Sequence, residues 1–324
     1  MDFNFKGLPQ LLRRFPDDAS AREFMEAQRW NGAPICPFCG CDKWYKLGDK
    51  KTYKCGNRKC NKKYSVTVGT VFHSCHIPLN ICFAGIYLMA SHKKGISSHQ
   101  LARDLNITQK SGWHLLHRIR EMYRVKEPVK LSGVIEVDET YMARKFHSEM
   151  KPLDFDYTPS WPNIKEKGCV FGMVQRKGQV VVKVFESNNA QEIRAAIKNH
   201  VEKSSFLFTD GSIIYNKELD KYKRGNVIHS SREYVKGDIH TNTIENFWGI
   251  MKRGIYGTYH QVSYKHLQRY CDEFSFRYNS RSIQDNTRFS LSLTKPEGRL
   301  KYKQLIANVQ RPKETHQEAQ NEWD

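Results

Sequence analysis

Residues 133–142, GVIEVDETYM, decide the fold, because they begin a run of strand and helix patterns. Two further strand patterns follow at 169–176 and 179–187, CVFGMVQR and QVVVKVFES, joined by a Lys-Gly turn. An amphipathic helix pattern at 190–203 precedes the apolar strand SFLFTDG at 205–211. The order is β-β-β-α-β, which predicts an α/β domain with a mixed sheet flanked by helices.

Two aspartates fall late in these strands. Asp138 lies toward the end of the first strand, and Asp210 ends the fourth. A cleft must solvate such a carboxylate or a cation must neutralise it, because burying it unpaired costs several kcal/mol. Side chains alternate along a strand, so we expect Glu139 to point to the opposite face and to have a structural role.

The segment HTNTIENFWGIMKR, residues 240–253, supplies a third carboxylate on a predicted helix, Glu245. Lys252 follows seven residues later, two turns along the same face. Two strand-end aspartates and a helix glutamate are suited to bind two Mg²⁺ (or Mn²⁺) ions about 4 Å apart, which activate the attacking and the leaving oxygen of a phosphodiester displacement. Lys252 would then face the substrate phosphate.

Nine cysteines in a chain without a secretion signal favour metal ligands and buried thiols over disulfides. Cys36 and Cys39 form one pair, Cys55 and Cys60 a second, and the segment between them has the composition of a short hairpin. Four thiolates at this spacing predict a structural zinc ribbon. Such a small module would depend on Zn²⁺ for much of its folding energy. We expect the nearby Cys41 not to be a ligand.

Residues 95–122, GISSHQLARDLNITQKSGWHLLHRIREM, predict two short helices around an Asn-Ile turn. Ser97 and Ser98 lie at the start of the first helix, and Thr108 is positioned to cap the second. With Arg118 and Arg120 on its second helix, the pair is typical of a helix-turn-helix whose second helix enters the major groove. An ordinary helical hairpin that packs on the next domain is the alternative.

The charge distribution favours nucleic acid as the partner. The chain has 53 Lys and Arg against 34 Asp and Glu, and residues 51–100 hold eight of the basic residues and no acidic ones. No apolar run approaches the roughly 18 residues of a membrane span, and the charged N-terminus lacks a signal core. We therefore expect a cytoplasmic protein with no membrane partner.

Taken together, these motifs make the chain similar to DDE-type insertion-sequence transposases, in the zinc-ribbon, Merlin-related branch with an ISXO-like transposase domain. The resemblance runs from about residue 33 to 286 and depends on CPFC, SVTVGTVFH, SSHQLARDL, VDETY, TDG, HTNTIENFWGIMKRGIYGTYHQVS and HLQRYCDEFSFRYNSR. It implies an RNase H-like catalytic core, metal-dependent cleavage of double-stranded DNA at element ends, and strand transfer into target DNA.

The third metal ligand stays open. In this branch the position is often Asn, which makes Asn242 a candidate beside Glu245. An anionic oxygen binds a hard cation better than an amide does, which favours Glu245. Asn242 and Glu245 also have capping-box spacing, in which Glu245 would only return to the Asn242 backbone N–H.

The patterns divide the chain into an N-terminal helical segment, a zinc ribbon, a helix-turn-helix region, an RNase H-like domain and a polar tail, at 1–30, 31–72, 73–128, 131–300 and 301–324. The irregular segment 145–168 is expected as a loop at the active-site edge. Joining two element ends favours at least a homodimer on DNA. Two other functions remain open: a transposase-derived DNA-binding regulator without catalysis, and a hydrolytic RNase H-like nuclease.

Overall fold

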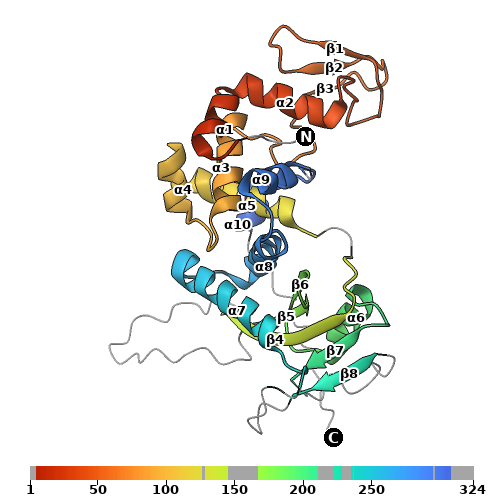
Figure 1. Ribbon diagram of the computed structural model, residues 1–324. Coiled ribbons are helices and arrows are strands. Elements are labelled where there is room, and N and C mark those ends of the chain that lie inside the picture. Colours follow the sequence, from red (N-terminus) through yellow and green to blue (C-terminus); the bar gives the residue numbers. More distant parts are fainter. Residues whose placement is uncertain are drawn as a thin grey trace, which may run out of the picture.

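The computed structural model describes residues 5–125, 128–144, 167–210, 222–227, 235, 237–294 and 296–307 (Figure 1). Most of the loop expected at 145–168 and of the tail expected after 300 lies outside these residues. None of the helices in the described ranges combines the length and the apolar character that crossing a membrane requires.

Two helices, α1 (Leu8–Arg14) and α2 (Asp18–Trp30), precede a small antiparallel sheet. Its strands β1 (Trp44–Lys46), β2 (Tyr53–Cys55) and β3 (Lys63–Tyr64) follow chain order. The apolar core of this sheet is small, with four buried residues, two of them cysteines: Cys36, Tyr53, Cys55 and Tyr64. A core of this size supplies little folding energy, so the sheet depends on additional cross-linking.

A helical core comes next, built by α3 (Leu79–Ser91), α4 (Ser98–Leu105) and α5 (Gln109–Tyr123). The predicted cap Thr108 is confirmed, because its side chain accepts the backbone N–H of Ser111. The first helix begins at the predicted serines, and the Ser97 side chain accepts the backbone N–H of Gln100. Asn106 ends α4 in the left-handed conformation, with φ 51°. The predicted pair of helices around an Asn-Ile turn is therefore present.

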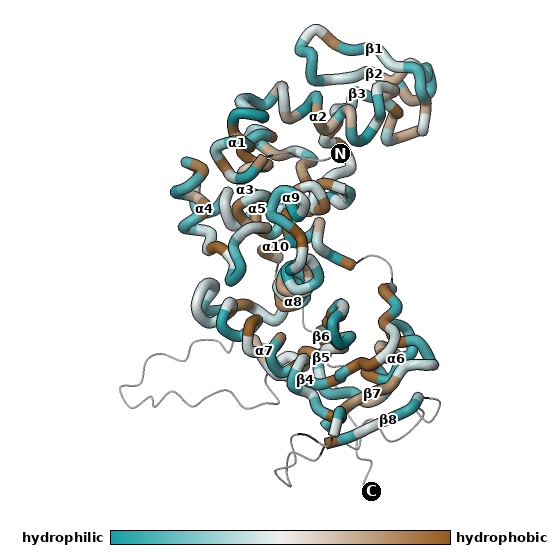
Figure 2. Tube along the Cα trace, in the orientation of Figure 1, coloured by the Kyte–Doolittle hydropathy of each residue, from teal (hydrophilic) through white to brown (hydrophobic). Residues whose placement is uncertain are grey.

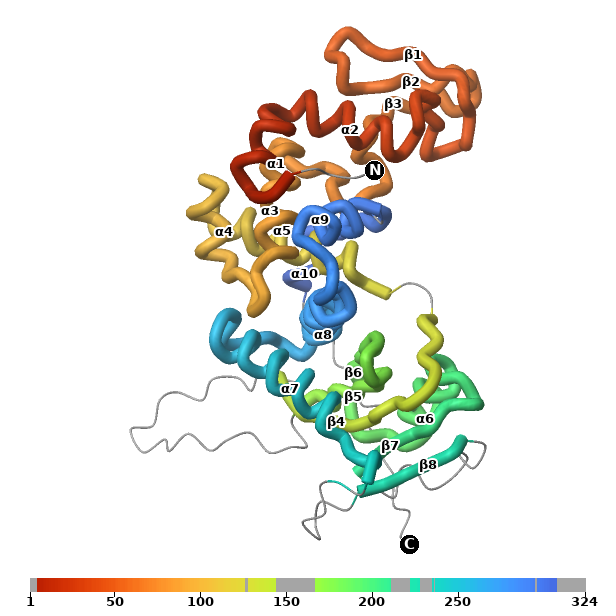
Figure 3. The backbone as a smooth tube through the Cα atoms, viewed as in Figure 1, coloured from red at the N-terminus to blue at the C-terminus, as the bar shows by residue number. Residues whose placement is uncertain are grey.

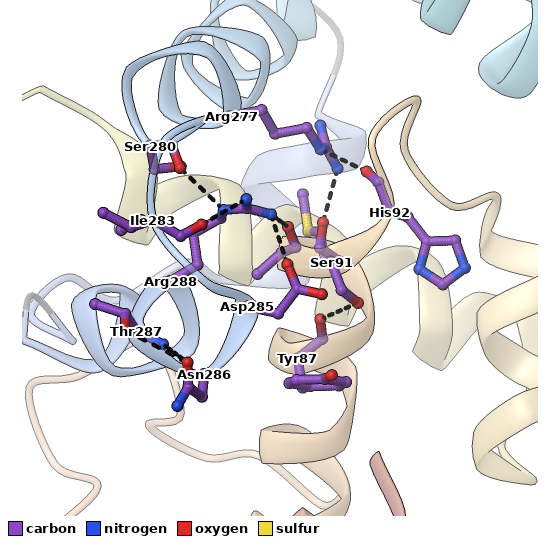
Figure 4. Close-up of polar contacts among 12 residues, drawn as sticks. Tyr87, Ser91, His92, Arg277, Ser280, Ile283, Asp285, Asn286, Thr287 and Arg288 are labelled. Atoms are coloured by element: carbon purple, nitrogen blue, oxygen red, sulfur yellow. Dashed lines mark hydrogen bonds and ion pairs between the residues drawn. The ribbon is translucent and has the colours of Figure 1, made fainter. Parts of the chain in front are cut away.

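The C-terminal helices return to this helical core. Helix α9 (Asp285–Leu293) packs against α3, while α8 (Tyr264–Asn279) contacts both α5 and β6, so it lies between the helical core and the sheet (Figure 3). The last carbonyls of α3 lack partners within the helix and are bound by arginine side chains instead. Arg277 donates to Met89 O and His92 O, and Arg288 donates to Ala90 O (Figure 4).

The main sheet has the strand order β6-β5-β4-β7-β8. Its strands are β4 (Val134–Arg144), β5 (Lys167–Gln175), β6 (Val180–Phe185), β7 (Phe206–Thr209) and β8 (Lys223–Asn226). Strand β5 pairs antiparallel with both β4 and β6. On the other side of β4, β7 pairs parallel with β4, and β8 pairs parallel with β7. Three antiparallel strands followed by two parallel ones on the other side of the first strand form the RNase H-like fold, as predicted.

Helices cover both faces of this sheet. On one face, α6 (Ala190–His200) packs on alternate residues of the strands, including Ile135, Val137 and Phe171. On the other, α7 (Asn242–Gly254), a π-helical turn at Ile255–Tyr259 and α8 enclose a second core. Figure 2 shows the hydrophobic stretches of the central strands between these layers. The short helix α10 (Tyr302–Ile306) ends the described chain.

Candidate active site

Asp138 and Asp210 lie side by side because β4 and β7 are parallel neighbours. Glu136 of β4 is in register with Phe208 of β7, and each aspartate lies two residues further along its chain. The two carboxylates therefore extend from the same face of the sheet. Oxygen atoms of Asp138, Asp210 and Glu139 all lie within 4.8 Å of one another, a spacing suited to a shared cation.

The position of Glu139 differs from the expectation. Strand alternation assigns it to the opposite face, yet its carboxylate joins the cluster. The pairing of β4 with β7 runs only from Val134 to Glu136, whereas β4 continues to Arg144. Beyond the paired stretch, the long Glu139 side chain can reach the edge of the sheet where Asp210 lies.

Burial raises the pKa of Asp138 to about 6. That value already includes a smaller upward contribution from the nearby carboxylates of Asp210 and Glu245, and an opposing one from the hydrogen bonds of the Glu139 backbone and the Trp248 indole. Like charges this close disfavour ionisation, and a bound divalent cation would reverse that effect. Three carboxylates that repel one another in a partly buried site therefore fit a hard metal ion with oxygen ligands.

Helix α7 crosses the cluster and is anchored there by a hydrogen bond. Trp248 is buried, and its Nε1 donates to Asp138 Oδ2 at 3.0 Å. Glu245 lies one turn earlier, close enough to influence the pKa of Asp138. Asn242 is the exposed first residue of α7, and Lys252 lies in its last turn.

Sequence reasoning missed the residue that fixes the start of α7, Glu136. This carboxylate is fully buried and accepts the backbone N–H groups of Thr243 and Ile244 at 2.7 and 3.0 Å. It also accepts the Thr243 hydroxyl at 2.8 Å and Arg176 Nε at 2.6 Å. A carboxylate at a helix N-terminus is favoured by the helix dipole and binds otherwise unpaired donors. Glu136 thus docks α7 on β4, two residues before Asp138.

The Asn242–Glu245 spacing does not form the capping box considered above. Thr241, not Asn242, is the N-cap residue, and its hydroxyl donates to Glu245 Oε1 at 2.8 Å. The Asn242 N–H points to His240 Nδ1 at 3.4 Å. Arg176 also holds this segment, because it donates to the carbonyls of Asp238 and His240.

The four predicted zinc ligands come together in the N-terminal sheet. The sulfur atoms of Cys36, Cys39, Cys55 and Cys60 lie within 4.8 Å of one another, with Cys36–Cys60 and Cys39–Cys55 separations of 3.8 and 3.6 Å. Cys41 is not in this group; its sulfur accepts the Lys43 N–H. A set of four clustered thiols fits tetrahedral Zn²⁺.

Arg118 and Arg120 are buried, whereas the helix-turn-helix interpretation expected them to be exposed on the second helix. Their side chains are 5% and 1% exposed. Arg120 pairs with Glu273 of α8 at 2.6 Å, and Arg118 donates to the His73 carbonyl at 3.2 Å. The second half of α5 is buried by packing against α8, whose sequence lies about 150 residues away, so only its first turn remains open.

A carboxylate cluster on an RNase H-like sheet, preceded by a four-cysteine ribbon, defines the class of DDE-type transposases. Family models agree: residues 130–279 match the ISXO2-like transposase domain, and residues 16–63 match the transposase zinc-ribbon domain. These two matches support a transposase.

The chain is also similar to an individual relative and, loosely, to solved structures. An uncharacterized protein in the transposable element ISH50 of Halobacterium salinarum is 24% identical over 277 residues, which is 82% of this chain and 92% of that protein. The Mos1 strand transfer complex is 13% identical, with a TM-score of 0.29, over 66% of this chain and 74% of that one. A simian T-cell lymphotropic virus intasome with the PP2A regulatory subunit B56 gamma is 11% identical, with a TM-score of 0.27, over 70% of each chain.

Proposed function

We propose that this transposase binds the terminal inverted repeats of an insertion sequence and catalyses metal-dependent DNA cleavage and strand transfer into target DNA. The observation that carries the proposal is the Asp138–Asp210 pair on two parallel neighbouring strands, with Asp138 in the middle of β4 and Asp210 directly after the end of β7. A binding protein has no use for clustered carboxylates beside a phosphate backbone, which they would repel.

Asp138 and Asp210 are the proposed metal ligands, with Glu245 of α7 as the third because it lies close enough to raise the pKa of Asp138. Glu139 is a further candidate, since its carboxylate is already within the cluster, and Asn242 stays an alternative. Bound Mg²⁺ or Mn²⁺ would activate the attacking and leaving oxygens of the phosphodiester. Lys252, two turns along α7 from Glu245, is proposed to contact the scissile phosphate.

Cys36, Cys39, Cys55 and Cys60 are the proposed ligands of a structural Zn²⁺ that holds the ribbon. The proposed domains keep the divisions predicted above: helical segment 1–30, ribbon 31–72, DNA-binding region 73–128, catalytic domain 131–300 and tail 301–324. Double-stranded DNA is the proposed partner, bound by at least a homodimer in the cytoplasm of a prokaryote, in association with the nucleoid. The excess of 53 basic over 34 acidic residues supports this partner.

The test incubates the protein and Mg²⁺ with DNA that carries the sequences on both sides of its gene, together with a plasmid target, and sequences all new junctions. Element ends joined to the plasmid, with a fixed-length target duplication, are the expected result. Asp210→Asn should abolish these junctions while DNA binding remains, and Lys203→Ala, at an exposed site, should leave them unchanged. Cleavage without joining would instead favour the nuclease, and binding without cleavage the regulator.

A further inference from the structure

A cavity of about 320 Å³ lies between α5, the segment before α3 and the segment that leads into α10. Its wall includes Leu115 from α5, His73 and Cys75 from the segment before α3, and Leu300 and Tyr302 from the C-terminal side. None of these residues belongs to the carboxylate cluster or to the ribbon cysteines. The proposed chemistry therefore leaves this cavity unexplained.

The lining of the cavity is cationic. Arg118 lines its buried part, and the exposed residues Arg299, Lys301 and His76 lie at its rim. Among the described residues, the lining contains no Asp or Glu. Ser111, in the first turn of α5, also lines it, and the N-terminal end of a helix adds partial positive charge.

Arg118 is the residue that most needs an anion. It is 5% exposed, and its Nε and Nη2 donate to His114 Nε2 and His73 O, both uncharged acceptors. Within the ranges that the structure describes, no carboxylate pairs with it. Arg120, two residues later on the same helix and just as buried, pairs with Glu273 at 2.6 Å. A buried cation without a counter-charge is costly, so an anion that enters the cavity would be strongly favoured.

We propose that this cavity is a phosphate-binding pocket, with Arg118 at its base and Arg299 and Lys301 at its rim, and that it takes a backbone phosphate of the bound DNA. Guanidinium groups and helix N-termini are suited to phosphate oxygens. The choice of DNA as the source rests on the proposed function. Such a contact positions the duplex without reading its sequence.

Cys75 provides a local reporter of occupancy, because it lines the cavity. A hydrogen bond with Cys82, whose sulfur lies 3.8 Å away, lowers the pKa of Cys75 to about 6. The thiol is therefore partly ionised and reactive at neutral pH. The rate of iodoacetamide labelling at Cys75, followed by mass spectrometry on the full-length zinc-loaded protein, measures whether the cavity is filled.

The test compares wild type, Arg118→Gln, Arg299→Ala and the exposed control Lys203→Ala, each checked for folding by its thermal melt. Duplex DNA and, separately, inorganic phosphate should slow Cys75 labelling in wild type and in the control. Arg118→Gln should lose this protection, bind DNA about tenfold or more weakly, and reduce the slope of log affinity against log salt by about 1. Should Arg118→Gln fail to fold, Arg299→Ala tests the same slope change from the rim.

Other results would overturn parts of the proposal. If wild type binds DNA but neither DNA nor phosphate protects Cys75, and the salt slopes do not change, the pocket is wrong while the proposed function stands. Protection by inorganic phosphate alone would reject DNA as the source and assign the pocket to free phosphate. Failure of wild type to bind any duplex would instead contradict the proposed function, and the phosphate experiment would still decide the pocket.

Discussion

Glu136→Gln tests whether the docking of α7 controls the candidate active site. The substitution keeps the size of the side chain but removes the charge that faces Arg176 and two backbone N–H groups. It also replaces one accepting carboxylate oxygen by the NH₂ group of Gln, which would face one of these donors and cannot accept its hydrogen bond. Loss of one partner of a buried ion pair costs 3–5 kcal/mol, and because the Arg176 side chain is 22% exposed, we expect about 3 kcal/mol, the lower end of that range.

The effect should appear both in stability and in metal dependence. Urea unfolding should show the loss of about 3 kcal/mol. Because α7 carries Glu245 and the Trp248 contact to Asp138, a loosened α7 should also raise the Mg²⁺ concentration needed for half-maximal DNA cleavage. Each 1.4 kcal/mol of weakened docking corresponds to about tenfold in an equilibrium constant.

The exposed residue Glu202 provides the matched control. Glu202→Gln should change neither the free energy of unfolding nor the Mg²⁺ concentration for half-maximal cleavage. An unchanged free energy of unfolding for Glu136→Gln would refute the energetic reasoning. Lower stability with an unchanged Mg²⁺ requirement would show that Glu136 is structural and does not position the metal-binding face of α7.

Three further predictions concern the metals and the response to acid. Removal of zinc by a chelator should unfold the ribbon and abolish recognition of element ends, and purified protein without stoichiometric zinc would contradict this. Glu245→Gln should reduce cleavage far more than Asn242→Ala. Full activity of Glu245→Gln would assign the third metal ligand to Asn242. If Glu139→Gln is inactive in that case, the third ligand is Glu139. Burial lowers the pKa of His117, so the folded state keeps it neutral while the unfolded state gains a proton below about pH 6.5. His117 should therefore lower the free energy of unfolding by up to about 1.4 kcal/mol for each pH unit below 6.5, and His117→Phe should reduce the pH dependence by that amount in urea titrations across pH.

Local patterns predicted much of the fold. Alternating apolar residues defined the strands, and the β-β-β-α-β order appears as β4, β5, β6, α6 and β7. The helix start at Ser97 and Ser98 and the cap Thr108 were predictable because capping depends on residues three positions away. The four clustered cysteines were also predictable, since each pair lies close in sequence.

The errors came from contacts between distant segments. Glu136 looked like one of several polar residues in a strand, because the α7 N–H groups that it binds are 107 and 108 residues away. Arg120 looked exposed because its partner Glu273 lies 153 residues further along the chain. Glu139 was misplaced for another reason: strand alternation assumes that the neighbouring strand continues, and β7 ends at Thr209.

Helix α5 links the proposed phosphate pocket to the candidate active site. Its residues from Ser111 to Arg118 contribute to the pocket lining, and Arg120, two residues further on, pairs with Glu273 of α8. Glu273 also pairs with Arg277 and accepts the Tyr259 hydroxyl from the π-helical turn that directly follows α7. Breaking one partner of such a buried network is strongly destabilising, so α5, α8 and α7 should keep a fixed geometry. A phosphate held by Arg118 would then lie at a fixed distance from the carboxylates under α7, as cleavage at a defined position requires.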